Sequence, residues 1–263
     1  MEKIKIPTFP LSQFVKYIWV YESSIDTTTN AIQTFAVEGC PIIIFHYKQP
    51  LKCKSGNNNW ATHPQQCVIG QIKHFGEIIE SGNEGMVAVV FYPDGLFPFI
   101  KFPVIELTNL IVDLELVFGK AVKEIQEKIC EANSNEKRIS LIEHFLLNQF
   151  KNKNNQCYND IRFAVSQMQS NNKISILNLA SEVNMSKRNF ERKFLDNVGL
   201  TPVFYNRIVR FQKAITLINQ QNRLTFTELA YMSGYYDQSH FIRDFKQFYG
   251  QPPKEFNQNQ NFG

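Results

Sequence analysis

Ser186–Tyr205 (SKRNFERKFLDNVGLTPVFY) and Asp237–Phe256 (DQSHFIRDFKQFYGQPPKEF) repeat one pattern at an offset of 51 residues. Upstream, Leu179 matches Leu229 at an offset of 50, so the second copy gains one residue in a turn. Each copy therefore predicts a short helix, a turn and a longer helix. The matched positions are Phe190 and Phe241, Arg192 and Arg243, Phe194 and Phe245, Gly199 and Gly250, Pro202 and Pro253, and Tyr205 and Phe256.

Capping residues and apolar spacing define the helices expected in this region. Ser186 and Asp237 are N-cap residues for the two longer helices, and Gly199 and Gly250 are C-cap residues that end them. Pro202 then opens a long helix at its first turn. The expected helices are Asp160–Gln169, Ser175–Val183, the helix from Ser186 to Gly199, Pro202–Gln220, Thr225–Met232 and Asp237–Tyr249.

The two longer helices place phenylalanines inward at helical spacing and polar, largely basic residues outward. The helix between the copies has about 19 residues and spans roughly 28 Å at 1.5 Å per residue, so it can act as a rigid spacer. Two helix-turn-helix units on one face of DNA need reading helices about 34 Å apart, which is one turn of the duplex. The repeat therefore favours DNA binding over the alternative, a helical protein-binding module.

The basic excess of the chain lies in its C-terminal region. From Cys157 to Gly263 there are 13 Lys and Arg against 8 Asp and Glu, whereas Met1 to Gln156 has 15 against 16. Arg138 is the only arginine before Cys157, and seven arginines follow it. Guanidinium groups suit bidentate contacts with phosphate and with guanine edges. The asymmetry therefore also indicates nucleic acid, with an ordinary solvated face as the alternative.

The first 93 residues are expected to be β-rich, and residues 94–152 helical. Short β-branched and aromatic runs bounded by turn residues predict antiparallel strands that curl into a barrel or a sandwich. The polar run Lys151–Gln156 (KNKNNQ) is the expected linker, which gives domains of 1–152 and 153–263. The expected strands are Leu11–Tyr21, Pro41–Tyr47, Gln66–Gln71, His74–Glu80 and Met86–Tyr92, with a loop or hairpin tip at Lys54–Asn59.

No catalytic residue and no metal site is predicted in the N-terminal region. His46, His63 and His74 could converge with Glu38 around a metal, but their spacing matches no zinc pattern, so structural or surface histidines are the favoured interpretation. Phosphate-binding glycine loops, G-x-S-x-G and H-E-x-x-H are absent from the sequence. Five aromatic residues could line a ligand site, although filling the core is the simpler interpretation. They are Phe45, Tyr47, Phe91, Tyr92 and Phe97.

The cysteines and the apolar runs point to a cytoplasmic protein. The five cysteines are scattered without a C-x-x-C pair and are interpreted as reduced thiols packed as small apolar groups. No apolar run reaches the ~18 residues of a membrane span. The opening MEKIKIPTFP is followed by no signal-peptide core. We therefore expect no membrane partner.

The C-terminal repeat resembles the DNA-binding domain of AraC/XylS-type transcription regulators over about 100 residues. Its second half, G-Y-x-D-Q-S-H-F-I-R-D-F-K-x-x-x-G-x-x-P-x-x-F, is highly specific for them. The resemblance implies a bacterial regulator, often an activator, whose two longer helices enter successive major grooves of promoter DNA. It also implies RNA polymerase as a partner and no cofactor. The matching residues are Leu179-Ala180, Ser186–Phe194, Gly199–Pro202, Leu229-Ala230, Gly234-Tyr235, Asp237–Phe245 and Gly250–Phe256.

The resemblance also implies which side chains touch DNA. Lysines are expected at phosphates, and Ile242 at a thymine methyl group. Glu191 departs from a basic surface, since a glutamate repels phosphate but can accept a hydrogen bond from cytosine N4. The implied base readers are Arg188, Glu191 and Arg192 in the first reading helix and Gln238, Ser239 and Arg243 in the second. The other implied contacts are Ser186, Lys187, Lys193, Ile242 and Lys246.

The N-terminal region resembles that of a subset of these regulators, but the resemblance supplies no ligand. The residues that carry it are Glu38–Pro41, Ile43–His46, His63-Pro64, Ile69–Gln71 and Met86–Gly95.

The sequence thus predicts an α+β chain with two domains. The first is an antiparallel β barrel-like domain with helices, and the second is all-α, with two helix-turn-helix units joined by a long helix. The expected function is sequence-specific transcription regulation. The N-terminal domain either binds a small-molecule effector or only forms a homodimer. An enzyme is disfavoured, because DNA-repair enzymes with a similar domain use a reactive cysteine in a Pro-Cys-His-Arg setting, which the five cysteines lack.

Overall fold

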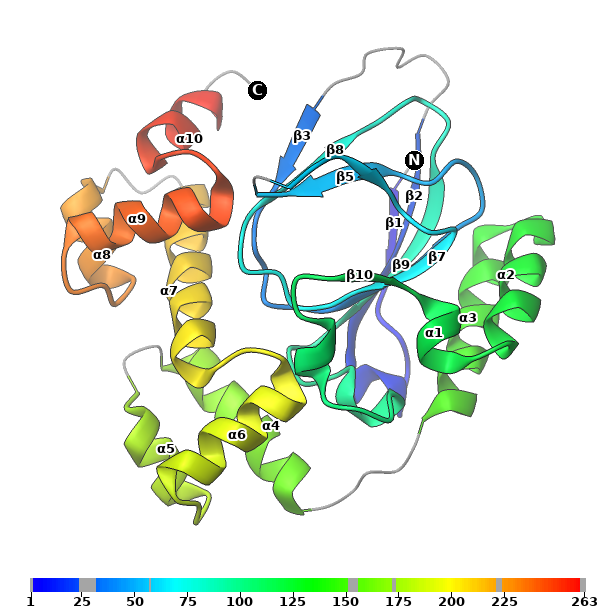
Figure 1. Ribbon diagram of the computed structural model, residues 1–263. Helices are drawn as coiled ribbons and strands as arrows, with labels where there is room; N and C mark the ends of the chain where they lie inside the picture. The colour runs from blue at the N-terminus through cyan, green and yellow to red at the C-terminus, as the bar shows by residue number, and fades with distance from the viewer. Residues whose placement is uncertain are drawn as a thin grey trace.

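The computed structural model describes residues 2–23, 32–56, 58–150, 156–171, 174–220 and 224–260. Figure 1 shows a β-rich N-terminal part, residues 2–150, beside a helical C-terminal part, residues 156–260. The strands are β1 Glu2–Lys5, β2 Val15–Glu22, β3 Ile32–Phe35, β4 Ile42–His46, β5 Lys52–Ser55, β6 Ala61–Thr62, β7 Gln66–Ile69, β8 Gly76–Ile79, β9 Gly85–Phe91 and β10 Ile111–Asp113.

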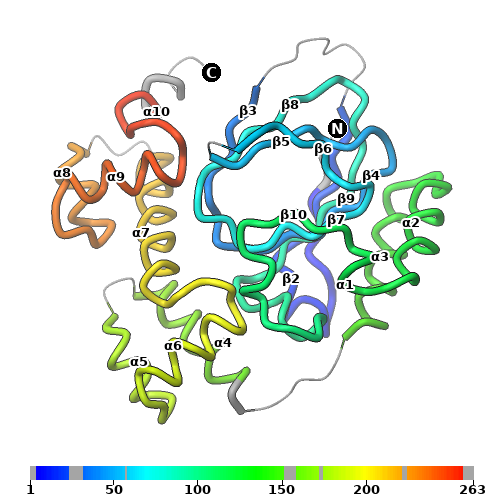
Figure 2. Tube along the Cα trace, viewed as in Figure 1, coloured from blue at the N-terminus to red at the C-terminus, as the bar shows by residue number. Residues whose placement is uncertain are grey.

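The helices of the N-terminal part include one 3-10 turn before β2 and two between β9 and β10, and the α-helices follow β10. They are η1 Leu11–Gln13, η2 Phe97–Phe99, η3 Val104–Leu107, α1 Leu114–Phe118, α2 Ala121–Glu131 and α3 Asn135–Gln149. Those of the C-terminal part are α4 Gln156–Ser170, α5 Ile176–Glu182, α6 Lys187–Val198, α7 Pro202–Asn219, α8 Phe226–Met232, α9 Gln238–Tyr249 and α10 Pro253–Gln260. Figure 2 follows the trace from α6 through α7 to α8 and α9.

The strands form two antiparallel sheets. The larger sheet has the order β1-β2-β9-β4-β7-β10, and the smaller has the order β3-β8-β5-β6. Among the described strands no ladder joins the two sheets, so the expected α+β class is confirmed but the sheets do not close into a barrel. β4 and β9 are almost entirely buried because both of their faces are covered, which explains their continuous apolar runs.

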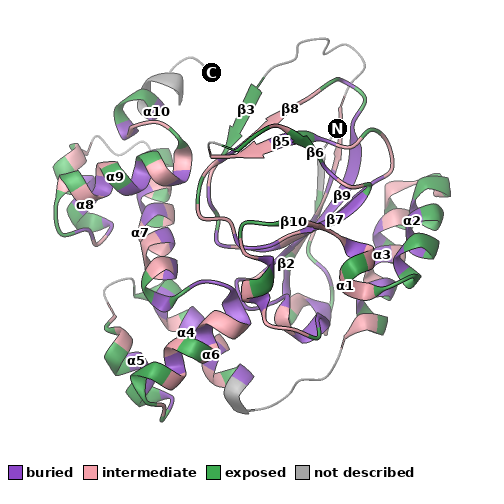
Figure 3. Ribbon diagram, in the orientation of Figure 1, coloured by how far each residue is buried: buried purple, intermediate pink, exposed green. Residues whose placement is uncertain are grey.

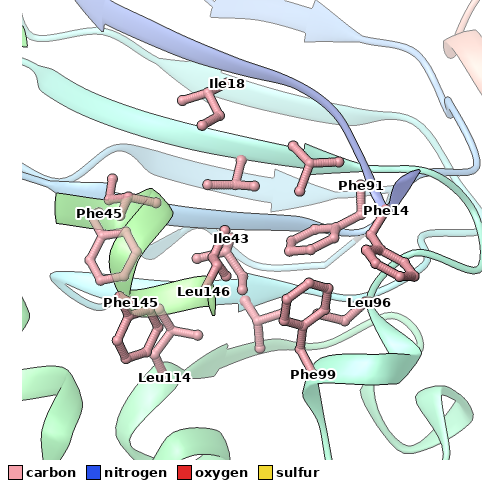
Figure 4. Packing of buried hydrophobic residues seen from close by; sticks show 14 of the residues in the cluster. Phe14, Ile18, Ile43, Phe45, Phe91, Leu96, Phe99, Leu114, Phe145 and Leu146 are labelled. Atoms are coloured by element: carbon pink, nitrogen blue, oxygen red, sulfur yellow. The ribbon is translucent and has the colours of Figure 1, made fainter. Parts of the chain in front are cut away.

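The main core of the N-terminal part lies between the larger sheet and its helices. Phe45 of β4 packs edge-on against Phe145 of α3, with ring centroids 6.0 Å apart, and Phe91 packs against Phe99 at 5.5 Å. Figure 4 shows these rings interdigitating with Ile43 and Leu146. Phe45 and Phe91 therefore fill the core, and Tyr47 and Phe97 pack against the same cluster.

Several N-terminal predictions differ from the structure. Leu11–Gln13 is a 3-10 helix instead of the start of a strand. Ile111–Asp113 lies in the region expected to be helical, yet it forms β10, which pairs with β7 at the edge of the sheet. β1, β3 and β6 were not predicted, because short strands at a sheet edge do not show the apolar pattern of a buried strand. β5 lies between β8 and β6 and was missed because its four residues (KCKS) include two lysines and no apolar run. β5 and β6 pair as the hairpin expected around Lys54–Asn59, of which Asn57 lies outside the described residues.

The predicted C-terminal helices are present, although α4 begins four residues earlier than expected, at Gln156, and α10 after Pro252 was not predicted. The helices pack on a separate apolar core, which includes phenylalanines of α6 and α9. Val37, from the N-terminal part, belongs to this C-terminal core, and Tyr158 of α4 belongs to the N-terminal core. Each core therefore takes in a buried side chain of the other part. Gln156, the last residue of the predicted linker, already belongs to α4, and residues 151–155 lie outside the described ones.

Among the described residues, none of the helices combines the length and the apolar character that a membrane span requires.

Candidate DNA-binding interface

The same caps begin and end α6 and α9. The Asn189 amide donates to Ser186 Oγ over 3.4 Å, and the His240 amide donates to Asp237 Oδ1 over 2.7 Å. Gly199 and Gly250 end the helices in the left-handed region, with φ of 83° and 92°. A residue with a Cβ is strained in this conformation, which explains glycine at both positions.

In α6 the first turn and the predicted reading face are open to solvent. Ser186, Lys187, Arg188 and Arg192 are exposed, whereas Glu191 and Lys193 are half-buried. The Lys187 ammonium lies 3.9 Å from Glu191 and partly neutralises it. Exposed i,i+4 pairs of this kind contribute little to stability, so a DNA backbone can displace them at low cost. The local pair formed by Arg192 and Asp196, at 3.6 Å, is of the same kind.

In α9 the predicted contacts divide between exposed and half-buried side chains. Ser239, Arg243 and Lys246 are exposed. Gln238 is half-buried, and its Oε1 accepts a hydrogen bond from Thr227 Oγ1 of α8 over 3.3 Å, which orients the amide. Ile242 packs in part against the helical core, so only part of its side chain is available to a thymine methyl group.

Tyr236 is an exposed side chain that the sequence interpretation missed. Its exposure is 95%, and it lies directly before the N-cap residue Asp237. In the sequence, Tyr236 occupies the unspecified position x of the G-Y-x-D motif, and the motif does not say whether this side chain is exposed. Neighbouring Tyr235 points the other way and is buried, with its ring centroid 5.4 Å from that of Phe241. Burial raises the pKa of Tyr235.

A buried ion pair fixes α9 to the helix between the copies. Arg207 of α7 donates from Nη2 to Asp244 Oδ1 over 2.7 Å and from Nε over 3.1 Å. The Asp244 carboxylate is completely buried, and the Arg207 side chain is 23% exposed. The same guanidinium donates to Gln247 Oε1 over 2.7 Å. Sequence reasoning did not find this pair, because the two residues lie 37 positions apart.

Arg210, one helical turn after Arg207, supports the second helix-turn-helix at its turn. Its guanidinium lies 5.3 Å from the centroid of the Tyr235 ring and donates to the Gly234 carbonyl over 3.5 Å. The helix α7 therefore holds both α9 and the turn before it.

Exposed residues lie along the outer sides of α5 and α8 (Figure 3).

The C-terminal ends of both reading helices lie against the N-terminal part. At Gly199 an added Cβ would lie 3.0 Å from Val104 Cγ1, and Thr108 Oγ1 donates to the Gly199 carbonyl over 2.6 Å. At Gly250 an added Cβ would lie 2.9 Å from the Phe75 ring. Two equivalent positions of the repeat thus lie against the same part of the protein, with Gly199 buried and Gly250 exposed.

The segment around Val37 continues this contact surface. The Val37 amide donates to the Phe248 carbonyl over 3.0 Å, and Gln212 Nε2 donates to the Val37 carbonyl over 2.6 Å. Gly39, at φ 72°, lies against Tyr205 and Ile208 of α7. The resemblance residues Glu38–Pro41 and Ile69–Gln71 therefore lie at or beside the contact between the two parts.

A second link joins α9 to the loop after β7. Gln247 Nε2 donates to the Lys73 carbonyl over 3.1 Å, and the Phe75 amide donates to the Gln247 carbonyl over 3.1 Å. Because Gln247 also accepts from Arg207, a continuous chain of hydrogen bonds runs from α7 through α9 to the N-terminal part.

The cysteines do not offer an activated nucleophile among the residues described. Cys40, Cys53, Cys67 and Cys130 are free thiols. Burial raises the pKa of Cys40 to about 12 and that of Cys53 to about 11, so both stay protonated. The side chain of Cys157 lies outside the described residues.

The structure brings together two of the three histidines considered for a metal site. His46 and His63 are buried side by side, while His74 and Glu38 are exposed elsewhere. Burial lowers the pKa of His46 to about 3 and that of His63 to about 4. Each imidazole is therefore neutral. Cys67 completes the group, and sequence reasoning missed it.

Two family models match different parts of the chain. Residues 179–259 match a helix-turn-helix domain, and residues 4–113 match a domain of unknown function, DUF6597. An uncharacterized HTH-type transcriptional regulator of Haemophilus influenzae is 32% identical over 88 residues, which are 34% of this chain and 29% of that protein. The match therefore spans less than a third of the length of this relative.

A solved structure that covers most of the chain supports the same fold. ToxT from Vibrio cholerae superposes with a TM-score of 0.50 at 10% identity, covering 91% of this chain and 97% of ToxT. A probable AraC family transcriptional regulator from Rhodopseudomonas palustris is 27% identical, with a TM-score of 0.37 over 38% of this chain and 96% of that one. The C-terminal part of the chain is a helix-turn-helix domain of the AraC/XylS type, and its N-terminal part is a domain of unknown function.

Proposed function

We propose that the chain is a sequence-specific regulator in which α6 and α9 read adjacent major grooves of double-stranded DNA. The observation that carries the proposal is the repeated placement of the two helices. Both direct their capped C-terminal ends toward the N-terminal part and their open first turns away from it (Figure 1). Helix α7, with 18 residues, spans roughly 27 Å and separates them by a distance comparable to a turn of duplex.

The exposed polar side chains of α6 and α9 suit two kinds of DNA contact. Arg188, Arg192 and Arg243 are exposed guanidiniums, which can form bidentate hydrogen bonds to guanine O6 and N7. Lys187 and Lys246 are point charges suited to phosphate. Gln238, held by Thr227, presents an amide of the kind that pairs with adenine. Since the outward residues differ between the two helices, the two half-sites should differ in sequence.

Binding to DNA from its own promoter tests this proposal. The purified full chain should bind a promoter fragment from its own locus at least about 10³-fold more tightly than random DNA of equal length at physiological salt. Fluorescence anisotropy at several salt concentrations measures both affinities. Equal affinity for the two DNAs would show that the protein binds the phosphate backbone without recognising the base sequence.

We also propose that the N-terminal part, expected to be a domain of residues 1–152, regulates the domain of 153–263 by holding its two reading helices in a DNA-competent placement. The support is that the N-terminal part contacts both helix ends and leaves both reading faces free. A single rigid body in contact with both helices reduces the entropy lost when both half-sites are engaged together. A small-molecule effector or a homodimer would act through this contact.

Val37→Ala should loosen the docking. It removes two methyl groups from a completely buried side chain, at a cost of about 1 to 3 kcal/mol. We expect weaker binding to DNA with both half-sites but unchanged binding to DNA with a single half-site. Val89→Ala removes the same groups from the N-terminal core and serves as the matched control. Tighter binding by Val37→Ala would mean that docking inhibits the protein.

The remaining parts of the proposal follow from the family alone. The protein activates transcription through contact with RNA polymerase, and it does so in the bacterial cytoplasm. Reporter expression from its own promoter, compared with and without the chain, separates activation from repression.

A further inference from the structure

Three buried side chains of the N-terminal part bring metal-binding atoms together. His46, His63 and Cys67 each offer one ligand atom, and these atoms all lie within 4.8 Å of one another. His46 ends β4, Cys67 lies on β7, and His63 immediately follows β6 of the smaller sheet. The group is therefore assembled from both sheets, and the DNA-binding helices supply none of it.

Strand register explains why these residues meet. Ile44 of β4 pairs with Cys67 of β7, and His46 lies two residues further along the same face of β4. The His46 amide donates to the Gln65 carbonyl over 2.8 Å, while the His63 amide donates to the Leu51 carbonyl over 2.9 Å. Each of the three residues is thus held by backbone pairing, so the arrangement exists without a ligand.

The spacing of the two imidazoles suits a tetrahedral ion. His46 Nε2 lies 3.3 Å from His63 Nδ1. Two nitrogen ligands at 2.0–2.1 Å from a tetrahedral Zn²⁺ are also about 3.3 Å apart. The other ring nitrogen of His46, Nδ1, is buried and has no hydrogen-bond partner within the described part of the chain. The hydrogen-bonding capacity of this imidazole is therefore only partly used.

The surroundings favour a soft metal over a hard one. Met86 of β9 stands directly opposite His46 in the ladder, so its thioether lies on the same face, and it is 3% exposed. Ile44, Leu51 and Ala88 are buried in the same cluster as Cys67 and Met86. Imidazole, thiolate and thioether ligands in an apolar setting select d¹⁰ ions such as Zn²⁺ or Cu⁺, whereas Mg²⁺ and Ca²⁺ need oxygen ligands.

We propose that His46, His63 and Cys67 bind one soft d¹⁰ metal ion, Zn²⁺ or Cu⁺, between the two sheets of the N-terminal part. Binding removes the thiol proton of Cys67 to solvent, and no electron is transferred. The ion would connect the larger sheet to the smaller one at a place where no ladder joins the described strands. This site does not depend on DNA binding.

Metal titration of the full chain tests the proposal. The protein, stripped with a chelator and kept reduced, should take up one equivalent of Zn²⁺ or of Cu⁺ in competition with a chromophoric chelator for each ion. X-ray absorption at the metal edge should show imidazole nitrogen and sulfur ligands. This measurement uses the natural sequence, so it does not depend on whether a variant folds. Failure to retain either ion, or an edge without sulfur, overturns the proposal.

Matched variants locate the site. Cys67→Ala and His63→Ala should each weaken metal binding by at least about 10-fold, while circular dichroism of the metal-free proteins confirms folding. Cys130→Ala and His74→Ala are the controls, since both side chains are exposed and lie outside the cluster. They should bind the ion as the natural chain does. Equal weakening by the controls would place the ion elsewhere and contradict the proposal.

Discussion

Replacing both Arg192 and Arg243 by alanine is expected to weaken binding to the specific site by about 2 to 6 kcal/mol. A base-reading arginine contributes about 1 to 3 kcal/mol of discrimination. The two residues lie on separate helices, so their effects should add. They are also the outward positions that the two copies share. Each single variant should relax sequence preference in one half-site only, which a binding-site selection measures.

The control for this prediction is the pair Lys187→Ala and Lys246→Ala. Both lysines are exposed on the same two helices and are expected at phosphates. Their loss should weaken binding to all sequences alike and reduce the salt slope by about 1 per lysine. If the arginine pair instead lost affinity equally on specific and random DNA, Arg192 and Arg243 would be phosphate contacts. Folding should hardly change, because the Arg192–Asp196 pair is exposed.

Arg207→Met is expected to lower the free energy of unfolding by about 3 to 5 kcal/mol. The change keeps an unbranched side chain but leaves the Asp244 carboxylate, which is completely buried, without its counter-ion. Breaking a buried pair from one side costs this much because a charge stays desolvated and unpaired. Urea unfolding followed by circular dichroism measures the loss. Arg207 lies away from the open first turns of α6 and α9, so any loss of DNA binding should follow the loss of folding.

The double variant Arg207→Met with Asp244→Leu separates charge from packing. Replacing both members by apolar groups removes the unpaired charge, so most of the lost stability should return. Arg210→Met is the matched control on the same helix, since Arg210 contacts the Tyr235 ring and the Gly234 carbonyl. Its cost should be about 0.5 to 2 kcal/mol. A double variant as unstable as Arg207→Met would show that packing, and not the buried charge, is decisive.

Local chemistry was enough to predict the C-terminal helices. Ser186, Asp237, Gly199 and Gly250 cap their helices through bonds to residues no more than four positions away. Apolar residues at helical spacing then decide which faces are buried. The N-terminal strands were predicted where apolar runs are long, as in β4 and β9. Strands at the sheet edges were missed, because their sequences do not show the apolar run of a buried strand.

By itself, then, the sequence determined the tandem repeat, the caps and the outward side chains of the two reading helices, since each depends on neighbours along the chain. Only the tertiary structure decided which distant residues meet. It paired Arg207 with Asp244, brought Gly199 and Gly250 against the N-terminal part, and placed Cys67 beside His46 and His63. The physical reason is that strand register and docking depend on the packing of whole surfaces, which no local run of residues encodes.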